Sequence, residues 1–483
     1  MNLIIDPWIP VVDHDATRKH VSLKELLCSP GPFTISLRRD DLELAALQLA
    51  ICLTQVMLAP KDENEFVQRL QSPLSPDIYD HAAAPFLDMF VVDHPEQPFM
   101  QRLGVLAKKT TSIQKLFPGL PAGDGTAWLF NTPHDVMHVC PSCIAIGLFQ
   151  QASCATGFGG GFKDPLRGKS PLTSLVHNHN TRKCIWKNII NKKYLQRLMP
   201  PNQKTKDAPT WIQHIEENHR YQSTDIGLLR GLFWQPSSIQ ILWHDGNTSC
   251  DICGIFCNRY SNNFLKNKFK YTFDDNAWPH PHTPKKFTKE KWKYLSYSYL
   301  QPAWTYIPSI LLNNKEYEAA PCVLHYKTID STSNIILILG GYVADQASIL
   351  ERRHDLVPLP AGWGEHTDDL IALLNIALTI RDVFRKKVYG LGKALGAPSL
   401  HLEAIRLFYD RSEEYIHAML RELNWDSFDH AQQEMSAKFI HLSLSILDEL
   451  VEPYAHKPET FKKTAVTRAT LGKEFKKIKE GLQ

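Results

Sequence analysis

Two Cys-x-x-Cys pairs constrain this chain more than any other feature of its sequence. The first pair is Cys140 and Cys143, and the second is Cys250 and Cys253. Four thiolates in two such pairs are the ligand set that tetrahedral zinc prefers in structural sites, so one ion would fasten together two distant parts of the chain. Four cysteine ligands leave no open position for water, and we therefore expect the zinc to be structural. Four unrelated buried cysteines are the alternative.

The composition is typical of a cytoplasmic protein with more than one domain. The chain has 483 residues, enough for two or three domains, and 43% of them are hydrophobic. The other cysteines are scattered among apolar residues, as reduced core cysteines are. The N-terminal segment lacks the pattern of a signal peptide, and no run of eighteen apolar residues predicts a membrane span. The net charge of +3 is modest, so a polyanion would have to bind a local basic patch.

The pattern of the chain changes near residues 358–364, where prolines and glycines cluster. We expect an α+β protein, with a large mixed α/β domain over residues 1–363 and a C-terminal antiparallel four-helix bundle over residues 364–483. Apolar residues recur at helical spacing in the second part, and the breaks between its segments are short. The predicted helices are Thr367–Leu395, Ser399–Leu423, Asp426–Tyr454 and Pro458–Leu482.

Local signals also predict individual elements of the first part. Ser22 is expected to cap a short helix, and Asp40 or Asp41 a strong one that ends before Pro60. An apolar run is expected to form a buried strand that leads into a turn at Gly340-Gly341, with a helix after it. The remaining predicted elements are strands over 171–176, 238–243 and 335–339, and helices over 187–198 and from Ser348 to Arg353.

A glycine-rich loop, GFGGGFK (Gly157–Lys163), lies between the two cysteine pairs. It does not match a nucleotide-binding loop. A dinucleotide fingerprint needs glycine where Phe162 stands, and the Gly-Lys-Ser at 168–170 lacks its leading glycine and is followed by Pro171. Glycine lets the main chain approach a ligand closely, for example the floor of a DNA minor groove. An ordinary flexible turn is the alternative.

Lysines alternate with aromatic residues after the second cysteine pair. The stretch Phe264–Tyr299 includes Lys266, Lys268 and Lys270, and a second lysine run at 285–293. Lysines neutralise phosphates while aromatic rings pack or stack on bases, but an exposed sheet with lysine edges explains the pattern equally well. The last predicted helix is also rich in lysine, which fits either a solvated face or a surface that follows phosphates.

Signals for catalysis are missing from the sequence, so we expect no enzyme. The histidines of WPHPH (278–282) could bind a metal, but the prolines between them favour structural packing. No Ser/His/Asp order, zinc-hydrolase motif or pair of carboxylates stands out. Gln346 lies near a predicted turn, where an amide could replace base hydrogen bonds and act as a wedge, although a plain turn is the default.

Several long motifs show that the chain resembles a known family, the CasA large subunits of the type I-E CRISPR surveillance complex Cascade. The resemblance covers essentially the whole length. The motifs are LRRDDLELAAL (Leu37–Leu47), HPEQPFMQ (His94–Gln101), GFGGGFK, RGLFWQP (Arg230–Pro236), WPHPH and GGYVADQASILERRHD (Gly340–Asp355).

The resemblance implies an N-terminal α/β domain of unusual fold, a C-terminal helical bundle and a role without catalysis. That role is recognition of the protospacer-adjacent motif in duplex DNA through the minor groove, followed by the start of R-loop formation. Family DNA contacts fall on three features of this sequence. They are the glycine loop (Gly157, Gly159, Gly160 and Gly161, with Gly160 the contacting residue), the lysine finger Lys268, and the wedge Gln346 with its neighbours Asp345 and Ala347.

The resemblance also implies partners. These are a crRNA, target double-stranded DNA, the backbone and small subunits of Cascade, and a helicase-nuclease effector. The loop that starts at Leu129, Phe130 and Asn131 would contact the 5′ handle of the RNA and a neighbouring subunit. The chain departs from the family in two places. Asp345 replaces the usual asparagine and adds a negative charge near phosphates, and Leu129 replaces the usual phenylalanine, with Phe130 beside it.

Two other functions compete with DNA recognition. A metal-dependent nuclease acting on bound nucleic acid would need acidic clusters with open metal positions, and the sequence shows none. A scaffold whose zinc domain binds only protein is the other possibility. Incubation with DNA and a divalent metal distinguishes the nuclease from the others.

Overall fold

The computed structural model describes residues 1–120, 135–199, 207–273, 276–454, 456 and 458–481, and the chain divides into two units. The second unit includes the whole of the predicted C-terminal part and two short stretches from earlier in the chain. The predicted domain boundary at residue 363 therefore stays a prediction. The first unit comprises Met1–Tyr297, Asn313–Ile329 and Leu337–Leu356, and the second comprises Ser298–Leu312, Asp330–Ile336 and Val357–Gln483.

Helix α2 (Asp40–Leu58) is the central helix of the first unit, and it is buried on nearly every side. Among the described residues it is the one helix long and apolar enough to cross a membrane, but 89% of the relevant window is buried in the protein. That burial is typical of a core helix. Its N-cap residue is Arg39, with no side-chain cap, so the predicted aspartate cap is wrong. The Asp41 carboxylate bonds to other partners instead.

Short elements precede and follow α2. A three-stranded antiparallel sheet has the strand order β2-β1-β3. Ser22 caps α1 as predicted, because its hydroxyl accepts a hydrogen bond from the Glu25 N–H. These elements are β1 (Ile9–Val12), β2 (Arg18–Val21), α1 (Leu23–Cys28), β3 (Thr34–Ile35), α3 (Glu63–Gln71), α4 (Pro76–Ala83) and the 3₁₀ helices η1 (Ala84–Phe90) and η2 (Ile113–Leu116).

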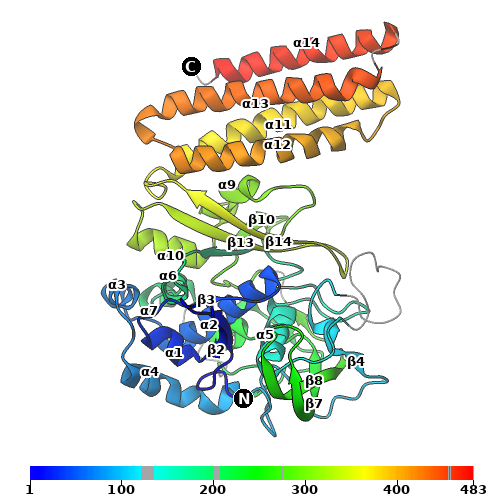
Figure 1. Cartoon of the computed structure of the whole chain (residues 1–483). Coiled ribbons are helices and arrows are strands. Elements are labelled where there is room, and N and C mark those ends of the chain that lie inside the picture. The colour runs from blue at the N-terminus through cyan, green and yellow to red at the C-terminus, as the bar shows by residue number, and fades with distance from the viewer. Residues whose placement is uncertain (121–134, 200–206, 274–275, 455, 457, 482–483) are drawn as a thin grey trace. The chain divides into compact units, whose positions relative to one another are not determined.

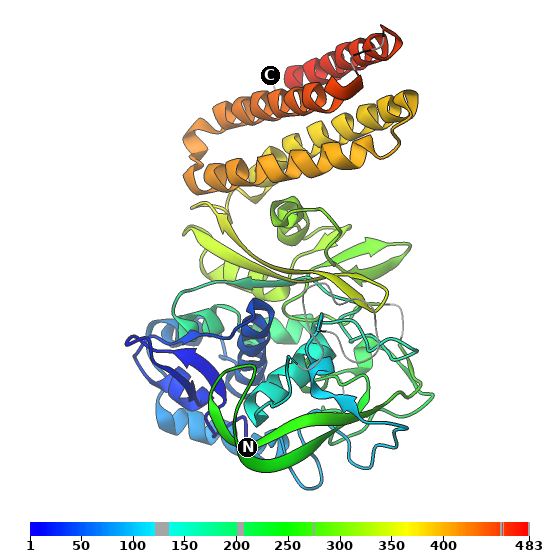
Figure 2. The ribbon, with the colours of Figure 1, turned by 45° about the vertical axis from the view of Figure 1, so that its right-hand side comes forward.

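Two long antiparallel hairpins belong to separate three-stranded sheets, and both are visible in Figure 2. In one, β7 (Ser238–Ser249) pairs with β8 (Phe256–Asn267), which also pairs with β4 (Thr111–Ser112). In the other, β13 (Ile335–Asp345) lies between β14 (Ser348–Leu359) and β5 (Thr173–Val176). The predicted strands at 171–176, 238–243 and 335–339 are thus present, and the last two are longer than predicted.

The structure contradicts two predictions about the second hairpin. Gly340-Gly341 is not a turn, because β13 continues to Asp345. A Cβ at Gly340 would lie 2.0 Å from Leu44 Cδ2, so any side chain there would displace Leu44 of α2, and glycine allows the close packing. The segment from Ser348 is a strand, β14, and not a helix. Its alternating exposure matches the period of a strand with one solvent face.

The rest of the first unit consists of short elements. The helix predicted over 187–198 starts only at Lys192, because Asn191 caps it by accepting a hydrogen bond from the Tyr194 N–H. The helix before it ends at Lys187. The elements are α5 (Pro141–Ser153), α6 (Thr181–Lys187), α7 (Lys192–Leu198), β6 (Arg220–Tyr221), η3 (Ser223–Asp225), α8 (Leu228–Leu232), β9 (Thr272–Phe273), β10 (Lys285–Thr288), β11 (Lys291–Tyr294), β12 (Tyr317–Glu318) and α10 (Pro321–Ile329).

Four long helices dominate the second unit, coloured yellow to red in Figure 1. Helix α11 packs against the other three, and α13 packs against both α12 and α14. The four helices match the predicted segments closely, while the antiparallel bundle as a whole remains a prediction. They are α11 (Thr367–Leu395), α12 (Leu400–Glu422), α13 (Phe428–Val451) and α14 (Pro458–Glu480), with η4 (Ala303–Tyr306), α9 (Ile307–Leu311), η5 (Trp425–Ser427) and η6 (Glu452–Tyr454) beside them in the unit.

Candidate nucleic-acid interface and cysteine cluster

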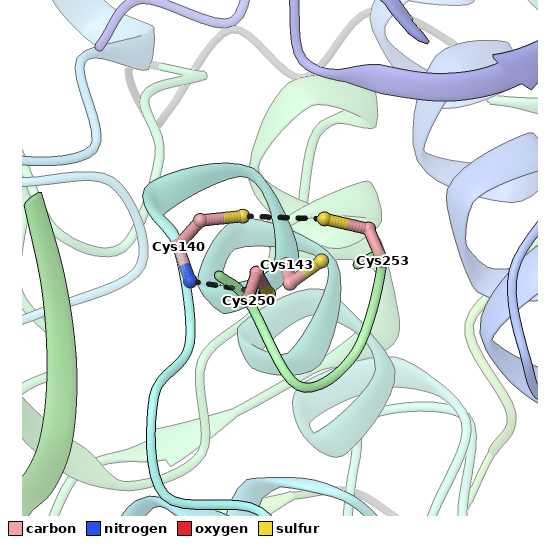
Figure 3. Close-up of side chains that lie close together, drawn as sticks. All are labelled: Cys140, Cys143, Cys250 and Cys253. Atoms are coloured by element: carbon pink, nitrogen blue, oxygen red, sulfur yellow. Dashed lines mark hydrogen bonds between the residues drawn. The ribbon is translucent and has the colours of Figure 1, made fainter. Parts of the chain in front are cut away.

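The four predicted metal ligands meet at the N-terminal end of α5. Cys140 is the N-cap residue of α5 and Cys143 lies in its first turn, while Cys250 and Cys253 lie in the turn between β7 and β8. Their Sγ atoms all lie within 4.8 Å of one another, and all four residues are buried. Figure 3 shows the Sγ atoms of Cys140 and Cys253 facing each other, 3.8 Å apart.

Backbone hydrogen bonds fix the hairpin turn that presents the second pair. Asp251 accepts hydrogen bonds from the N–H groups of Met137 and His138, each at 2.7 Å. Gly254 has φ +76° and donates to the Cys250 carbonyl at 2.8 Å, which closes the turn. A left-handed residue is needed at this point, and glycine adopts it without cost. The second Cys pair is therefore held against the segment that carries the first.

The geometry of the cluster fits zinc. Zinc–sulfur bonds of about 2.3 Å in a tetrahedron place the sulfurs about 3.8 Å apart, which is the separation of Cys140 and Cys253. Burial raises the pKa of Cys143, whereas hydrogen bonds from the Cys140 and Cys143 thiols lower the pKa of Cys253. A divalent cation would replace the protons shared among the thiols. The cluster could therefore hold a metal ion, as predicted.

The glycine loop follows α5 and is closed at its base. Gln151 at the end of α5 donates to the Thr156 carbonyl at 3.0 Å, and the Gly157 N–H donates to Asp164 Oδ1 at 3.0 Å. Gly157 is buried, and a Cβ there would lie 2.6 Å from the Lys163 carbonyl oxygen. Gly157 therefore shapes the loop and does not line its surface.

The outer part of the loop exposes main chain. Gly159, Gly160 and Gly161 have φ values of +76°, +56° and +88°, and the last two are exposed. Three consecutive left-handed residues are strongly disfavoured for residues with a Cβ. The glycines thus make this backbone shape possible and leave it bare to a ligand.

Lys268 lies directly on the glycine loop. It follows the last residue of β8, and its exposed ammonium group donates to the Gly160 carbonyl at 2.6 Å. A Cβ at Gly161 would lie 3.0 Å from the same nitrogen. An ammonium group carries three donors, so one bond to the loop leaves two for a ligand.

The tip of the β13–β14 hairpin lies on the other side of the loop. Asp345, Gln346 and Ala347 are exposed at this tip, and Gln346 has φ +52°. A Cβ at Gly159 would lie 3.2 Å from Ala347 Cβ, and the Thr156 hydroxyl donates to the Ala347 carbonyl at 3.5 Å. No sequence motif had indicated that Thr156 takes part in this site. Three segments predicted separately as DNA contacts therefore meet in the first unit.

Cations gather under the loop. Lys266 Nζ lies 4.6 Å and 4.7 Å from the ring centroids of Phe158 and Phe162. Burial, with the nearby charges of Lys115 and Lys109, lowers the pKa of Lys266. Three lysines thus lie near one another here although the net charge of the chain is only +3. Nothing in the sequence indicated that Lys266 contacts the aromatic rings of the glycine loop.

Other predicted residues lie elsewhere or outside the described chain. Lys285 is buried and pairs with Glu318 at 3.0 Å, so it is not part of an exposed lysine surface. His280 and His282 are fully buried, and burial lowers the pKa of both, to about 3 for His282. Their packing role is the one predicted. The three residues of the proposed RNA-handle loop, Leu129, Phe130 and Asn131, lie outside the described residues.

The sequence matches the model of one protein family over most of its length. The model of the CRISPR-associated protein Cse1 matches residues 2–445. This chain belongs to the CRISPR-associated Cse1 family. The resemblance found in the motifs is therefore confirmed.

Solved structures share the fold over nearly the whole chain. Cse1 from Acidimicrobium ferrooxidans is 14% identical with a TM-score of 0.74, covering 100% of this chain and 99% of that one. CasA (Cse1) from Thermus thermophilus is 17% identical with a TM-score of 0.74 and the same coverage. A chain of a CRISPR RNA-guided surveillance complex is 16% identical with a TM-score of 0.73, covering 98% and 99%. At these identities the likeness shows the fold alone, and that fold is α+β with a C-terminal helical region.

Proposed function

We propose that this chain is the large subunit of a crRNA-guided Cascade complex. In this role it recognises the protospacer-adjacent motif through the minor groove, wedges the duplex open to start R-loop formation and helps to recruit the helicase-nuclease. Membership of the Cse1 family supports the proposal, as does the presence of the same fold in a solved surveillance complex. The partners would be crRNA, target DNA and the other Cascade subunits, and zinc would occupy the cysteine cluster.

The observation that carries the proposal is the meeting of three segments on one exposed surface. Gly160 receives a hydrogen bond from Lys268, and Gly159 packs against Ala347, next to Gln346. Main-chain groups, an ammonium group and an amide are thus presented together. Lysine and glutamine are among the side chains that read the minor groove, and bare main chain can approach its floor closely.

The physics of the minor groove explains why such a surface would accept more than one motif. A·T and T·A pairs present only acceptors there, and G·C adds one donor, so a few backbone groups and one lysine discriminate weakly. Separating a base step costs a few kcal/mol, which an inserted side chain can offset at one junction. Pairing with the guide is nearly balanced against loss of the duplex, and it supplies the sequence specificity.

We also propose that the chain itself is not a nuclease. Apart from the cysteines, the one group of potential metal ligands among the described residues is Asp13, His14 and Asp15. Asp13 Oδ1 accepts hydrogen bonds from the N–H groups of Asp15 and Thr17, so this carboxylate organises a turn. Purified chain with duplex DNA and Mg²⁺ should give no cleavage. Cleavage abolished by a point substitution in this chain would favour the nuclease instead.

The direct test is reconstitution with guide RNA and the other subunits. R-loop formation is followed on a matched target with its motif and on the same target with the motif scrambled. The proposal expects rapid opening only when both this chain and the motif are present. Equal opening without this chain would contradict it.

A further inference from the structure

A buried carboxylate joins the hairpin that carries Gln346 to two helices. The Tyr342 hydroxyl of β13 donates to Asp41 Oδ2 at 2.7 Å. Gln150 Nε2 of α5 donates to the same Oδ2 at 3.0 Å and to the Tyr342 oxygen at 2.7 Å. Asp41 is 6% exposed, Tyr342 2% and Gln150 0%. The three side chains form a closed triangle, shielded from water, between α2, α5 and β13.

The charges around the triangle are balanced and engage both strands of the hairpin. Arg39 donates to both oxygens of Asp41, at 2.9 Å and 2.6 Å. Arg352 of β14 pairs with Asp40 at 2.6 Å and lies 3.8 Å from Asp41. Burial acts to raise the pKa of Asp41, but Arg39 and then Tyr342 lower it to below its ordinary value. The carboxylate is therefore ionised and can accept all these hydrogen bonds.

The triangle is the buried anchor of strand β13 nearest the tip, and the Thr156 hydroxyl adds one hydrogen bond, at 3.5 Å, to the Ala347 carbonyl at the tip itself. Residues 337–343 of β13 are buried, and residues 345–348 are exposed. Gln346 lies four positions after Tyr342, which is roughly 13 Å along a strand. A tilt of about 10° at the anchor would move the tip by roughly 2 Å, which is more than a positioned site tolerates. The orientation of the tip therefore depends on the triangle as well as on the Thr156 contact.

We infer that Asp41, Tyr342 and Gln150 position the hairpin so that Gln346 meets the DNA beside the glycine loop. The inference rests on the proposed function, in which Gln346 opens the duplex. A network that only stabilised the fold would affect every DNA substrate equally. A positioning network affects only the substrate that has to be opened.

The first experiment needs no DNA. Tyr342→Phe keeps the ring and removes the hydroxyl, so the fold is retained. Tyr79→Phe is the matched control, because Tyr79 is fully buried and its hydroxyl donates to the Ile4 carbonyl at 2.7 Å. Hydrogen exchange of the amides at 343–349 should be several-fold faster in Tyr342→Phe and unchanged in Tyr79→Phe. Unchanged exchange in Tyr342→Phe would overturn the inference, whatever the hairpin does on DNA.

The second experiment measures opening by the assembled complex on two targets. One is a closed duplex, and the other carries mismatches that pre-open the base steps next to the motif. Tyr342→Phe should slow opening about fivefold on the closed duplex and leave the pre-opened target unchanged. Equal slowing on both targets would overturn the inference and leave the network a purely structural one.

A double substitution separates this inference from the proposed function. If the triangle acts through Gln346, Tyr342→Phe should add no further slowing in a Gln346→Gly background. If Gln346→Gly slows opening and Tyr342→Phe does not, the inference is wrong and the proposed function stands. If neither variant slows opening on the closed duplex, both the wedge and its positioning are contradicted.

Discussion

The two long hairpins, β7–β8 and β13–β14, are held at opposite ends. In β7–β8 the turn is buried in the cysteine cluster, and the far end of the hairpin leads to Lys268. In β13–β14 the turn is exposed at Gln346, and side chains on the strands hold the hairpin, among them Tyr342 and Arg352. Each hairpin brings one exposed polar residue to the glycine loop.

This difference shows how a residue with few contacts of its own can be positioned from a distance. A buried cysteine cluster holds the turn of β7–β8, so the opposite end of that hairpin can carry the contact residue. When the turn of a hairpin is itself the part that contacts a ligand, the hairpin must be held in place by its strands. Substitutions at the anchors should therefore affect the fold or the orientation, whereas substitutions at the tips should affect DNA alone.

Loss of one cluster cysteine should have the largest effect. Cys250→Ser removes one of the four sulfurs, and the three that remain cannot complete a closed tetrahedral site. We expect the purified protein to lose its zinc and more than about 4 kcal/mol of unfolding free energy. Metal analysis measures the zinc content, and urea denaturation measures the free energy of unfolding.

The matched control is Cys257→Ser on the same hairpin, since Cys257 is half-buried and outside the cluster. It should keep the metal and lose little stability. Undiminished zinc in Cys250→Ser would show that the cluster is not the metal site.

Removal of the wedge should affect opening and spare the fold. Gln346 has φ +52°, where a residue with a Cβ is strained and glycine is not. In Gln346→Gly the relief of strain and the entropy cost of glycine roughly cancel, so stability should change by less than about 1 kcal/mol. Opening of a closed duplex by the complex should slow about tenfold, which corresponds to about 1.4 kcal/mol. An unchanged rate in stopped-flow measurements would remove the wedge from the mechanism.

Loss of the lysine on the glycine loop should have a smaller effect, and a motif-dependent one. Lys268→Ala should weaken binding of motif-containing duplex by about fivefold, the lower end of what one base contact contributes. Lys270→Ala is the control, because Lys270 is also exposed and lies two residues further along. Binding is measured with and without the motif. Equal loss on both DNAs would make Lys268 a general phosphate contact.

The smallest effect is expected at the departure from the family pattern. Asp345 is exposed beside Gln346, and in the proposed complex it would place a negative charge near phosphates. Asp345→Asn should strengthen duplex binding about twofold at low salt, and the gain should shrink as salt rises. A titration at two salt concentrations measures this. Weaker binding would indicate that the carboxylate itself accepts a hydrogen bond from the DNA.

The sequence predicted the elements whose signal is local or chemically specific. Helical spacing located α11 to α14, because each carries an apolar face. The spacing of the cysteines predicted a cluster across the β7–β8 turn, because two such pairs favour one tetrahedral site. The resemblance named the loop, lysine and wedge residues that the fold brings together.

The missed features depend on contacts between distant residues. Ser348–Arg353 contains residues that suit a helix, but pairing with β13 makes it a strand. Gly340 looks like a turn residue until Leu44 is seen packed against it. Asp41 looks like a helix cap until its partner 301 residues away, Tyr342, is placed beside it. Local patterns carry no information on such pairs.

The most direct test of the central claim asks which groove of the motif the complex reads. Inosine in place of guanine removes the minor-groove amino group, and 7-deazaguanine removes the major-groove N7 acceptor. Binding and R-loop opening are measured on targets with either base at each guanine of the motif. The account predicts that inosine changes both the binding affinity and the rate of R-loop opening. It predicts that 7-deazaguanine changes neither of them. Sensitivity to 7-deazaguanine with indifference to inosine would contradict it.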